Sequence, residues 1–316
     1  MVRSLWSAAT GMNAQQTNVD TIANNLANVN TVGYKSQVAQ FKSLLYQTLQ
    51  TATTTANGEP KPTSSQVGLG VRTSSINNIF TQGAMLSSQS SSAVAIQGAG
   101  FFAIQGIGGE TLYTRNGDFT WAIMGSDLML TTADGNAVLD IQGQPILVDA
   151  AKVRTDYEAA FQRYLEEWRA QQHRNPDGSL RNPDAEEPTM ADMTSMALIS
   201  TQISIDAKGG INYFFGGLEF PLDMHFGLHQ FANVGGLERI GNSLYRATAA
   251  SGPAQNEDTT LGLVKSSIAQ NYLEGSNVYV ADEMVNLIVA QRAYEMNSKA
   301  ITTSDEMMQT ANNLKR

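Results

Sequence analysis

The chain has 316 residues, a formal charge of −9 and a sequence pI near 4.8, and 42% of its residues are hydrophobic. This length allows one large domain or two smaller ones with a buried core. The acidic balance, together with the lack of any stretch that combines basic and aromatic residues, argues against a nucleic-acid-binding surface. The absence of cysteine excludes disulfides and thiolate chemistry and leaves the redox compartment open.

The opening stretch MVRSLWSAATGMNAQQ has one arginine and no continuous apolar run. We therefore expect neither a cleavable secretory signal nor a membrane span at this end. If the protein leaves the cytoplasm, it needs another route.

Residues 3 to 29 are predicted to form a helix about 40 Å long with an apolar seam. At a spacing of seven residues, mostly apolar side chains fall on two lines, which is the heptad pattern of a coiled coil. The alternative is an ordinary amphipathic helix that packs on a β-domain. The first line is Leu5, Met12, Val19 and Leu26, and the second is Ala8, Gln15, Ile22 and Val29.

The stretch ANNLANVN ends this helix with four asparagines, a residue that helices disfavour. Asn24, Asn25 and Asn28 lie off the seam, where each amide can both donate and accept hydrogen bonds. We expect these amides to fix the lateral register between packed helices of neighbouring copies. Asn30 is expected to cap the helix, and Gly33 to permit the turn out of it. The alternative is a frayed helix end rich in loop formers.

Residues 36 to 92 are predicted to be an extended linker, because TATTTANGEPKPTSSQVGLG is rich in threonine, serine, glycine and proline. Residues 93 to 250 then have the texture of a mostly antiparallel β-domain, with short apolar runs such as AVAIQGAGFFAIQG and ISIDAKGGINYFF. The Asn116-Gly117 pair predicts a type I′ hairpin between LYTR and DFTW. The GIGGE run at 106 to 110 is interpreted as a hairpin turn, because it has neither the lysine nor the following helix of a phosphate loop.

An interruption of the β-domain, residues 154 to about 200, begins with the stretch TDYEAAFQRYLEEWRAQQ. Its aromatic and aliphatic residues have helical spacing, which predicts a surface helix packed on the β-domain. The polar segment that follows repeats Arg-Asn-Pro-Asp and is interpreted as a connecting loop. The spaced residues are Tyr157, Phe161, Tyr164, Leu165 and Trp168.

Residues 251 to 275 are predicted to be a return linker, and residues 276 to 316 a C-terminal coiled-coil segment, in which residues 276 to 314 would form a helix about 58 Å long. This helix also has an apolar seam with a spacing of seven, and two such seams in one chain predict that the two terminal helices pair. The fold class is therefore α+β, with a coiled coil of terminal helices and a central β-domain that carries a helical insertion. The seam is Val280, Leu287, Tyr294, Ile301 and Met308, and a neighbouring line is Ala293, Ala300, Met307 and Leu314.

One seam buries too few apolar side chains to offset the conformational entropy of ordering so long a helix. We therefore expect each terminal helix to be ordered only when it also packs on other surfaces, and identical surfaces on neighbouring copies suit this role. This predicts a polymer whose ends fold on assembly.

A rival class is a β-rich envelope enzyme or binding protein with helical extensions. The chain has three histidines, His173, His225 and His229, and the last two lie in DMHFGLHQF, where alternation predicts a strand. Residues four apart on a strand are about 13 Å apart, too far to share one metal. No Ser-His-Asp arrangement is evident, so we expect no catalytic, metal or cofactor-binding residues.

The terminal stretches resemble the signatures of the bacterial flagellar rod and hook family. AATGMNAQQTNVDTIANNLANVNTVGYKSQ is similar to the N-terminal signature, and EGSNVYVADEMVNLIVAQRAYEMNSKAITTSDEMMQTANNL to its C-terminal counterpart. VAIQGAGFFAI, YTRNGDF and LERIGNSLYRAT resemble parts of the family's β-domain. RSLWSAATGM, FKSLLYQTLQ and the closing LKR are most similar to the members that build the distal part of the rod.

The resemblance implies a structural axial protein that polymerises helically around a central export channel in the cell envelope. Its partners would be copies of itself, the proximal rod and hook proteins, an encircling ring and the flagellar type III export apparatus, which exports without cleavage. A proximal rod or hook protein of the same family is the alternative. By the resemblance, the stretch 46 to 62 is associated with a straight, stiff rod. The insertion at 154 to 200 departs from the family's pattern, and we expect it to thicken the outer wall or to contact an encircling ring.

Overall fold

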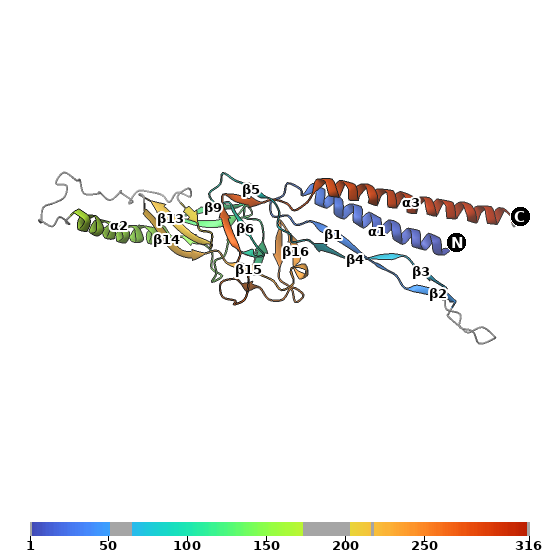
Figure 1. Ribbon diagram of the computed structural model, residues 1–316, viewed down its shortest axis with the longest axis horizontal. Helices are drawn as coiled ribbons and strands as arrows, with labels where there is room; N and C mark the ends of the chain where they lie inside the picture. Colours follow the sequence, from blue (N-terminus) through green and yellow to red (C-terminus); the bar gives the residue numbers. More distant parts are fainter. Residues whose placement is uncertain (1, 51–64, 173–202, 216–217, 315–316) are drawn as a thin grey trace. The chain divides into compact units, whose positions relative to one another are not determined.

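The computed structural model of the protein describes residues 2–50, 65–172, 203–215 and 218–314 (Figure 1). The chain divides into two compact units. The helical unit comprises residues 1–81 and 276–316, and the β-unit comprises residues 82–275. The predicted α+β class, with a helix at each end of the chain and mostly antiparallel sheets, is confirmed.

The helical unit contains two long antiparallel helices, α1 (Val2–Ala27) and α3 (Val280–Asn313), which lie side by side (Figure 1). Ser4 Oγ lies 3.3 Å from Ser304 Oγ near one end of the pair, and Asn25 bonds Glu283 near the other. Because α3 continues beyond Ser304, its last two turns extend past the start of α1.

Two antiparallel strand pairs complete the helical unit. β1 (Gln37–Ser43) pairs with β4 (Val71–Asn78), and β2 (Tyr46–Gln50) pairs with β3 (Ser65–Gly68). The sequence predicted an extended linker over 36–92, and the described part of this stretch is extended but paired. Gly70, just before β4, has φ +106° and packs so closely on Thr10 of α1 that a Cβ there would overlap Thr10 Oγ1.

The β-unit is built around a six-stranded antiparallel sheet with the order β16-β17-β8-β7-β15-β18. Along the chain the strands of this sheet are β7 (Phe101–Gln105), β8 (Thr111–Thr114), β15 (Leu228–Gln230), β16 (Glu238–Gly241), β17 (Leu244–Arg246) and β18 (Gln255–Asn256). β7 and β8 form a hairpin, and its turn is the GIGGE run interpreted that way from the sequence. A short 3-10 helix, η2 (Val234–Gly236), precedes β16.

The β-unit also contains smaller sheets. Residues 251–275, expected as a return linker, contribute β18, β19 and β20 to the β-unit. Two sheets have three strands: β9 (Phe119–Met124), β10 (Asp127–Thr132) and β11 (Leu147–Val148), and β12 (Ile203–Ile205), β13 (Gly210–Phe215) and β14 (Leu218–His225). Two have two strands: β6 (Val94–Gln97) with β19 (Ser267–Gln270), and β5 (Met85–Ser87) with β20 (Tyr272–Glu274).

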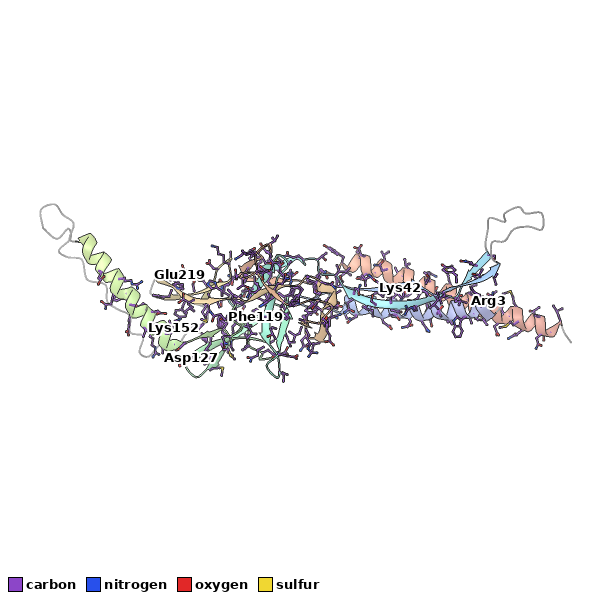
Figure 2. The ribbon with its side chains drawn as sticks, turned by 90° about the horizontal axis from the view of Figure 1, so that it is seen from below. Arg3, Lys42, Phe119, Asp127, Lys152 and Glu219 are labelled. Carbon is purple, nitrogen blue, oxygen red and sulfur yellow. The ribbon has the colours of Figure 1, made fainter. Side chains whose placement is uncertain are left out.

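The core of the β-unit is centred on phenylalanines from several strands. Phe119 is almost completely buried and is labelled inside the β-unit in Figure 2. Its ring meets that of Phe102 edge to face at 5.1 Å and stacks on that of Phe226 at 6.3 Å. Aromatic contacts of this kind add to the free energy of burial itself.

The hairpin predicted at Asn116-Gly117 is wrong. β8 pairs with β7 and β17, whereas β9 pairs with β10, so the chain crosses between sheets at this point. Asn116 Oδ1 accepts the backbone N–H of Asp118 at 2.9 Å, which forms an Asx turn. Gly117 is required for space, because a Cβ there would overlap the carbonyl oxygen of Val94.

Helix α2 (Ala150–Gln172) lies where the sequence predicts a helix, and its first turns pack on the β-unit core. Val153, Tyr157 and Phe161 are buried, and the Tyr157 ring meets Phe220 of β14 at 5.7 Å. Asp127 Oδ1 accepts the backbone N–H of Ala150 at 3.1 Å, and Figure 2 shows Asp127 beside this first turn. The side chains of Tyr164, Leu165 and Trp168, and the loop predicted at 173–200, lie outside the described residues.

Candidate functional site

The C-terminal end of α1 is joined to the rest of the helical unit by one buried amide. Asn25 is 1% exposed, and its Nδ2 donates to Gln37 O and to Glu283 Oε1, both at 2.8 Å. Its Oδ1 accepts from Gln37 N at 2.9 Å and from Tyr34 OH at 3.1 Å. All four hydrogen-bonding positions of the amide are used within the chain. The intersubunit role expected for Asn25 is therefore replaced by an intrachain one.

Asn28 and Asn24 of the same stretch form hydrogen bonds near the end of α1 itself. Asn28 Nδ2 donates to Asn24 O at 2.9 Å and to Asn24 Oδ1 at 3.1 Å, and Asn28 Oδ1 accepts from Thr31 Oγ1 at 3.1 Å. These bonds satisfy the end of α1, the role expected for Asn30. Asn30 and Asn24 are both exposed. Gly33 has φ +67° at the turn out of the helix.

A second buried amide, Asn277, holds the entrance to α3 and was missed from the sequence. Its Oδ1 accepts the backbone N–H of Ser36 at 2.7 Å, and its Nδ2 donates to Ile79 O at 2.8 Å and to Thr81 Oγ1 at 2.9 Å. Lys35 is 1% exposed and its Nζ donates to Thr81 O at 2.7 Å. No local pattern identifies this cluster, because its members are far apart in sequence.

Small and polar residues are prominent among the buried residues of α1 and α3. Ala8 and Ala14 of α1 and Ala290 and Ser304 of α3 are buried. A Cβ at Gly11 would lie 2.9 Å from Asn297 Nδ2, so the absence of a side chain at Gly11 allows close approach.

The predicted seam residues fall into three classes of exposure. Ile22 is buried at 5% exposure, while Val280 and Tyr294 are 40% exposed and Leu314 is 83% exposed. The remaining apolar seam residues are half-buried, so the helix pair leaves part of each in contact with water. They are Leu5, Met12, Val19 and Leu26 in α1, Val29 just after it, and Leu287, Ile301 and Met308 in α3.

Helix α3 also has a second apolar stripe, turned away from α1. At 100° per residue, its five members lie within about 40° of one another, roughly a third of a turn from buried Ala290. Each is between 51% and 83% exposed. We call these residues the outer stripe: Val285, Val289, Met296, Met307 and Leu314.

The β-strands of the helical unit also expose apolar side chains. Leu45, Tyr46 and Leu49, in and just before β2, are 84%, 60% and 52% exposed. Tyr46 and Leu49 lie at the start of the stretch 46–62, and Leu45 directly precedes it; from residue 51 the stretch lies outside the described residues. The helical unit therefore has more than one apolar surface open to a partner.

The histidines and carboxylates of the described residues form no cluster suited to a metal ion. No group of three potential metal ligands occurs there. His225 lies in β14 and His229 in β15, so the single strand expected for DMHFGLHQF is two strands. Burial lowers the pKa of His229, against the opposing effects of its hydrogen bond to Gly227 O and of the Glu257 charge.

None of the described helices has the length and apolarity that a membrane crossing requires.

Three family descriptions match successive parts of the chain. Residues 5–35 match "Flagella basal body rod protein", residues 95–163 match "Flagellar hook protein FlgE/F/G D1 domain", and residues 269–314 match "Flagellar basal body rod FlgEFG protein C-terminal". The "Flagellar basal-body rod protein FlgG" of Borreliella burgdorferi is 37% identical over 322 aligned residues that cover all of both chains. The chain belongs to the flagellar rod and hook family.

Further relatives support this assignment. The protein of the same name from Agrobacterium fabrum is 38% identical, with 97% of each chain covered. The "Flagellar hook protein FlgE" of B. burgdorferi is 41% identical over 121 residues, which cover 38% of this chain and 27% of the hook protein. The similarity is thus full-length with rod proteins and partial with a hook protein. The family is structural, so the chain is not an enzyme.

Proposed function

We propose that the chain is a structural subunit of the bacterial flagellar rod, and that its copies assemble helically around a central channel. The full-length similarity to rod proteins, against a partial match to a hook protein, favours the rod, and within it the distal part. The cell envelope would be its location, reached by flagellar export without a cleavable signal. Proximal rod proteins, hook proteins, the export apparatus and an encircling ring would be its partners.

The observation that carries this proposal is the outer stripe of α3. A helix whose inner face already packs on α1 has further apolar side chains in water, among them Met296 of the outer stripe at 73% exposure, and Leu314, which caps the helix, is 83% exposed. Exposed apolar stripes of this length mark protein contacts. A surface that meets a different surface on the next copy makes a heterologous contact, which generates a filament when it does not close.

We further propose that α1 and α3 pair as a coiled coil and become fully ordered only on assembly. The predicted seam residues would then have two roles, with their buried sides packing within the chain and their exposed sides packing on neighbouring copies. Asn24, which is exposed, would be the asparagine of its stretch that faces another copy. The segment containing α2 would be an insertion directed to the outer wall.

The test changes the outer stripe without touching the α1 contact. A Val289→Glu, Met296→Glu double variant should keep the helix content of the dilute chain. Its critical concentration for polymerisation should rise at least about tenfold, because two apolar side chains worth about 1.5 to 3 kcal/mol each when buried would be replaced by charges. Polymerisation would be followed by light scattering and electron microscopy.

The matched control places two glutamates elsewhere on the exposed surface of the same helix. Gln291→Glu with Thr302→Glu adds the same number of acidic residues off the stripe and should polymerise within about twofold of the unmodified chain. Equal impairment of both variants would indicate a general charge effect and reject the outer stripe as the contact. Failure of the unmodified chain to form tubes at any concentration would reject the polymer.

A further inference from the structure

The loop of residues 257–266 in the β-unit, which follows β18, presents two aliphatic side chains to water. Leu261 is 100% exposed and Val264 is 85% exposed. A single exposed aliphatic residue is ordinary. Two of them three residues apart in one surface loop can contact the same partner only if the loop holds them in a fixed arrangement.

A buried carboxylate ties the two ends of this loop together. Glu257 is 3% exposed, and its Oε2 accepts the backbone N–H of Ser266 at 2.6 Å. Its Oε1 accepts from Ser266 Oγ at 2.8 Å and from Gln230 Nε2 at 2.9 Å. A carboxylate is stable in the interior only when its oxygens are bonded in this way.

Two further bonds hold the loop between its ends. Gln230 Nε2 also donates to the carbonyl oxygen of Val264 at 2.7 Å, and Lys265 Nζ lies 2.7 Å from Asp258 Oδ1. The loop therefore presents Leu261 and Val264 from a fixed backbone. Fixing a loop in advance lowers the entropic cost of binding, which is a property of contact surfaces.

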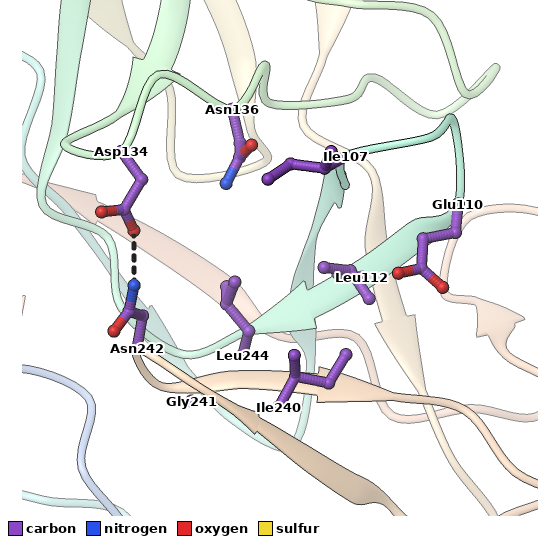
Figure 3. Close-up of a pocket in the computed structure, with 9 residues that line it drawn as sticks. All are labelled: Ile107, Glu110, Leu112, Asp134, Asn136, Ile240, Gly241, Asn242 and Leu244. Atoms are coloured by element: carbon purple, nitrogen blue, oxygen red, sulfur yellow. Dashed lines mark hydrogen bonds between the residues drawn. The ribbon is translucent and has the colours of Figure 1, made fainter.

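At another place on the β-unit there is a groove with a matching apolar lining (Figure 3). Its volume is about 370 Å³. Ile107, in the turn between β7 and β8, is 93% exposed, and Ile240 of β16 is 44% exposed. Leu112 and Leu244 complete the apolar lining between them. The groove thus leaves apolar surface open that a side chain from outside can cover.

Each side of the groove has one carboxylate, and of the two only Glu110 forms an ion pair. Figure 3 shows Glu110 and Asp134 on opposite sides of the apolar lining. Glu110 is paired with Arg246 at 2.9 Å. Asp134 accepts a hydrogen bond from Asn242 at 3.1 Å and, within the described part of the chain, has no basic partner. A basic group on the occupant would complete this end of the groove.

The loop and the groove lie at opposite edges of one sheet. β18, which leads into the loop, forms one edge of the six-stranded sheet, and β16, which lines the groove, forms the other. A contact between the loop of one copy and the groove of the next joins two different surfaces and is therefore heterologous. It repeats from copy to copy, as an open assembly requires.

We propose that the 257–266 loop of one copy docks in this groove on the next copy. Leu261 and Val264 cover Ile107 and Ile240, and Lys265, which is 64% exposed at its side chain, approaches Asp134. A second copy is the occupant because the loop carries both the aliphatic side chains and a cation, Lys265, which is exposed enough to contact Asp134 as well as Asp258, its partner within the loop. The inference rests on the proposed polymer and adds a contact between β-units to the helix contacts.

The natural lack of cysteine allows a direct test by disulfide trapping in the full-length polymer. A chain with Leu261→Cys and Ile107→Cys should give, under mild oxidation, a ladder of disulfide-linked dimers, trimers and longer species on a non-reducing gel. Both positions are exposed, so neither change should affect folding. Each single variant should give no product beyond a dimer.

A second double variant provides the matched control. Leu261→Cys with Ile123→Cys uses an equally accessible position, 76% exposed on β9 and outside the groove, and should give no ladder. If tubes form and the Leu261–Ile107 pair gives no ladder, or the control pair gives an equal one, the docking is overturned and the proposed function stands. If the unmodified chain forms no polymer, both the docking and the proposed function are rejected.

A double-mutant cycle tests the charge pair separately. Lys265→Gln and Asp134→Asn should each raise the critical concentration roughly two- to fivefold, as expected for an exposed ion pair. The double variant should be no worse than either single one, because the pair is already broken. Additive effects would overturn the contact between Lys265 and Asp134.

Discussion

The side-chain amide of Asn25 donates a 2.8 Å hydrogen bond to Glu283 and so joins the last turns of α1 to the first turn of α3 across 258 positions of sequence. The same amide exchanges hydrogen bonds with both the N–H and the C=O of Gln37 at the start of β1. One buried side chain thus sets the register of two helices and a strand. Such a polar cluster specifies a unique arrangement only when every member is bonded.

Replacing Asn25 should therefore be costly. Asn25→Ala would leave both main-chain groups of Gln37, the Tyr34 hydroxyl and the Glu283 carboxylate each without one partner. We expect a loss of about 2 to 4 kcal/mol in the free energy of unfolding of the helical unit. Amide hydrogen exchange in α1 and β1 would measure it.

The control for this variant is the neighbouring residue. Asn24→Ala removes an exposed amide and should change the same free energy by less than about 0.5 kcal/mol. Comparable losses for Asn24→Ala and Asn25→Ala would contradict the role of the buried cluster.

The sequence predicted the terminal helices well because their signal is local. Heptad spacing placed helices at 3–29 and 276–314, and the structure has them at Val2–Ala27 and Val280–Asn313. The roles of Asn25 and Asn277 were not predictable, because the partners of Asn277 are about 200 or more residues away. The pairing of β1 with β4 was hidden for a related reason, since polar and small residues dominate both strands. Periodicity identifies elements, whereas partner choice depends on tertiary contacts.

Gly117 illustrates the same limit and gives a second prediction. From the sequence, we expected glycine at this position because a type I′ turn needs positive φ. In the structure glycine is required for a different reason: the carbonyl oxygen of Val94 lies where a Cβ would be. Gly117→Ala should destabilise the β-unit by more than about 2 kcal/mol, since main-chain atoms would have to move. Thermal unfolding would measure the loss.

The control for Gly117 is a glycine that is required by its backbone conformation and not by lack of space. Gly125 has φ +71°, and a Cβ there would have nothing within 4 Å. Gly125→Ala should cost only about 1 to 2 kcal/mol, from backbone strain alone. A smaller cost at Gly117 than at Gly125 would reject the steric explanation.

The attachment of α2 gives a third prediction. Tyr157 is 3% exposed, with its ring against Phe220 of β14 and near Phe161. Tyr157→Ala should lower the free energy of unfolding of the β-unit by about 3 to 5 kcal/mol, the usual cost of removing a buried aromatic ring. Glu158→Ala, one residue along on the exposed side, should have little effect. Similar urea midpoints for the two variants would show that α2 does not contribute to the core.

A fourth prediction concerns the pH dependence of the β-unit. Burial lowers the pKa of His229 from its ordinary value of 6.5, so the unfolded chain binds a proton more readily than the folded one. The stability that neutral His229 contributes is complete above pH 6.5 and is lost as the pH falls through the lowered folded-state pKa. Hydrogen exchange of the β7 and β15 amides at pH 7.5 and 5.5 would report the change.

A glutamine variant separates this effect from general acid sensitivity. His229→Gln removes the titrating group and should flatten the pH dependence of unfolding between pH 7.5 and 5.5. If His229→Gln retained the full loss of stability on acidification, other groups would be responsible, because the buried imidazole would then have no part in the linkage.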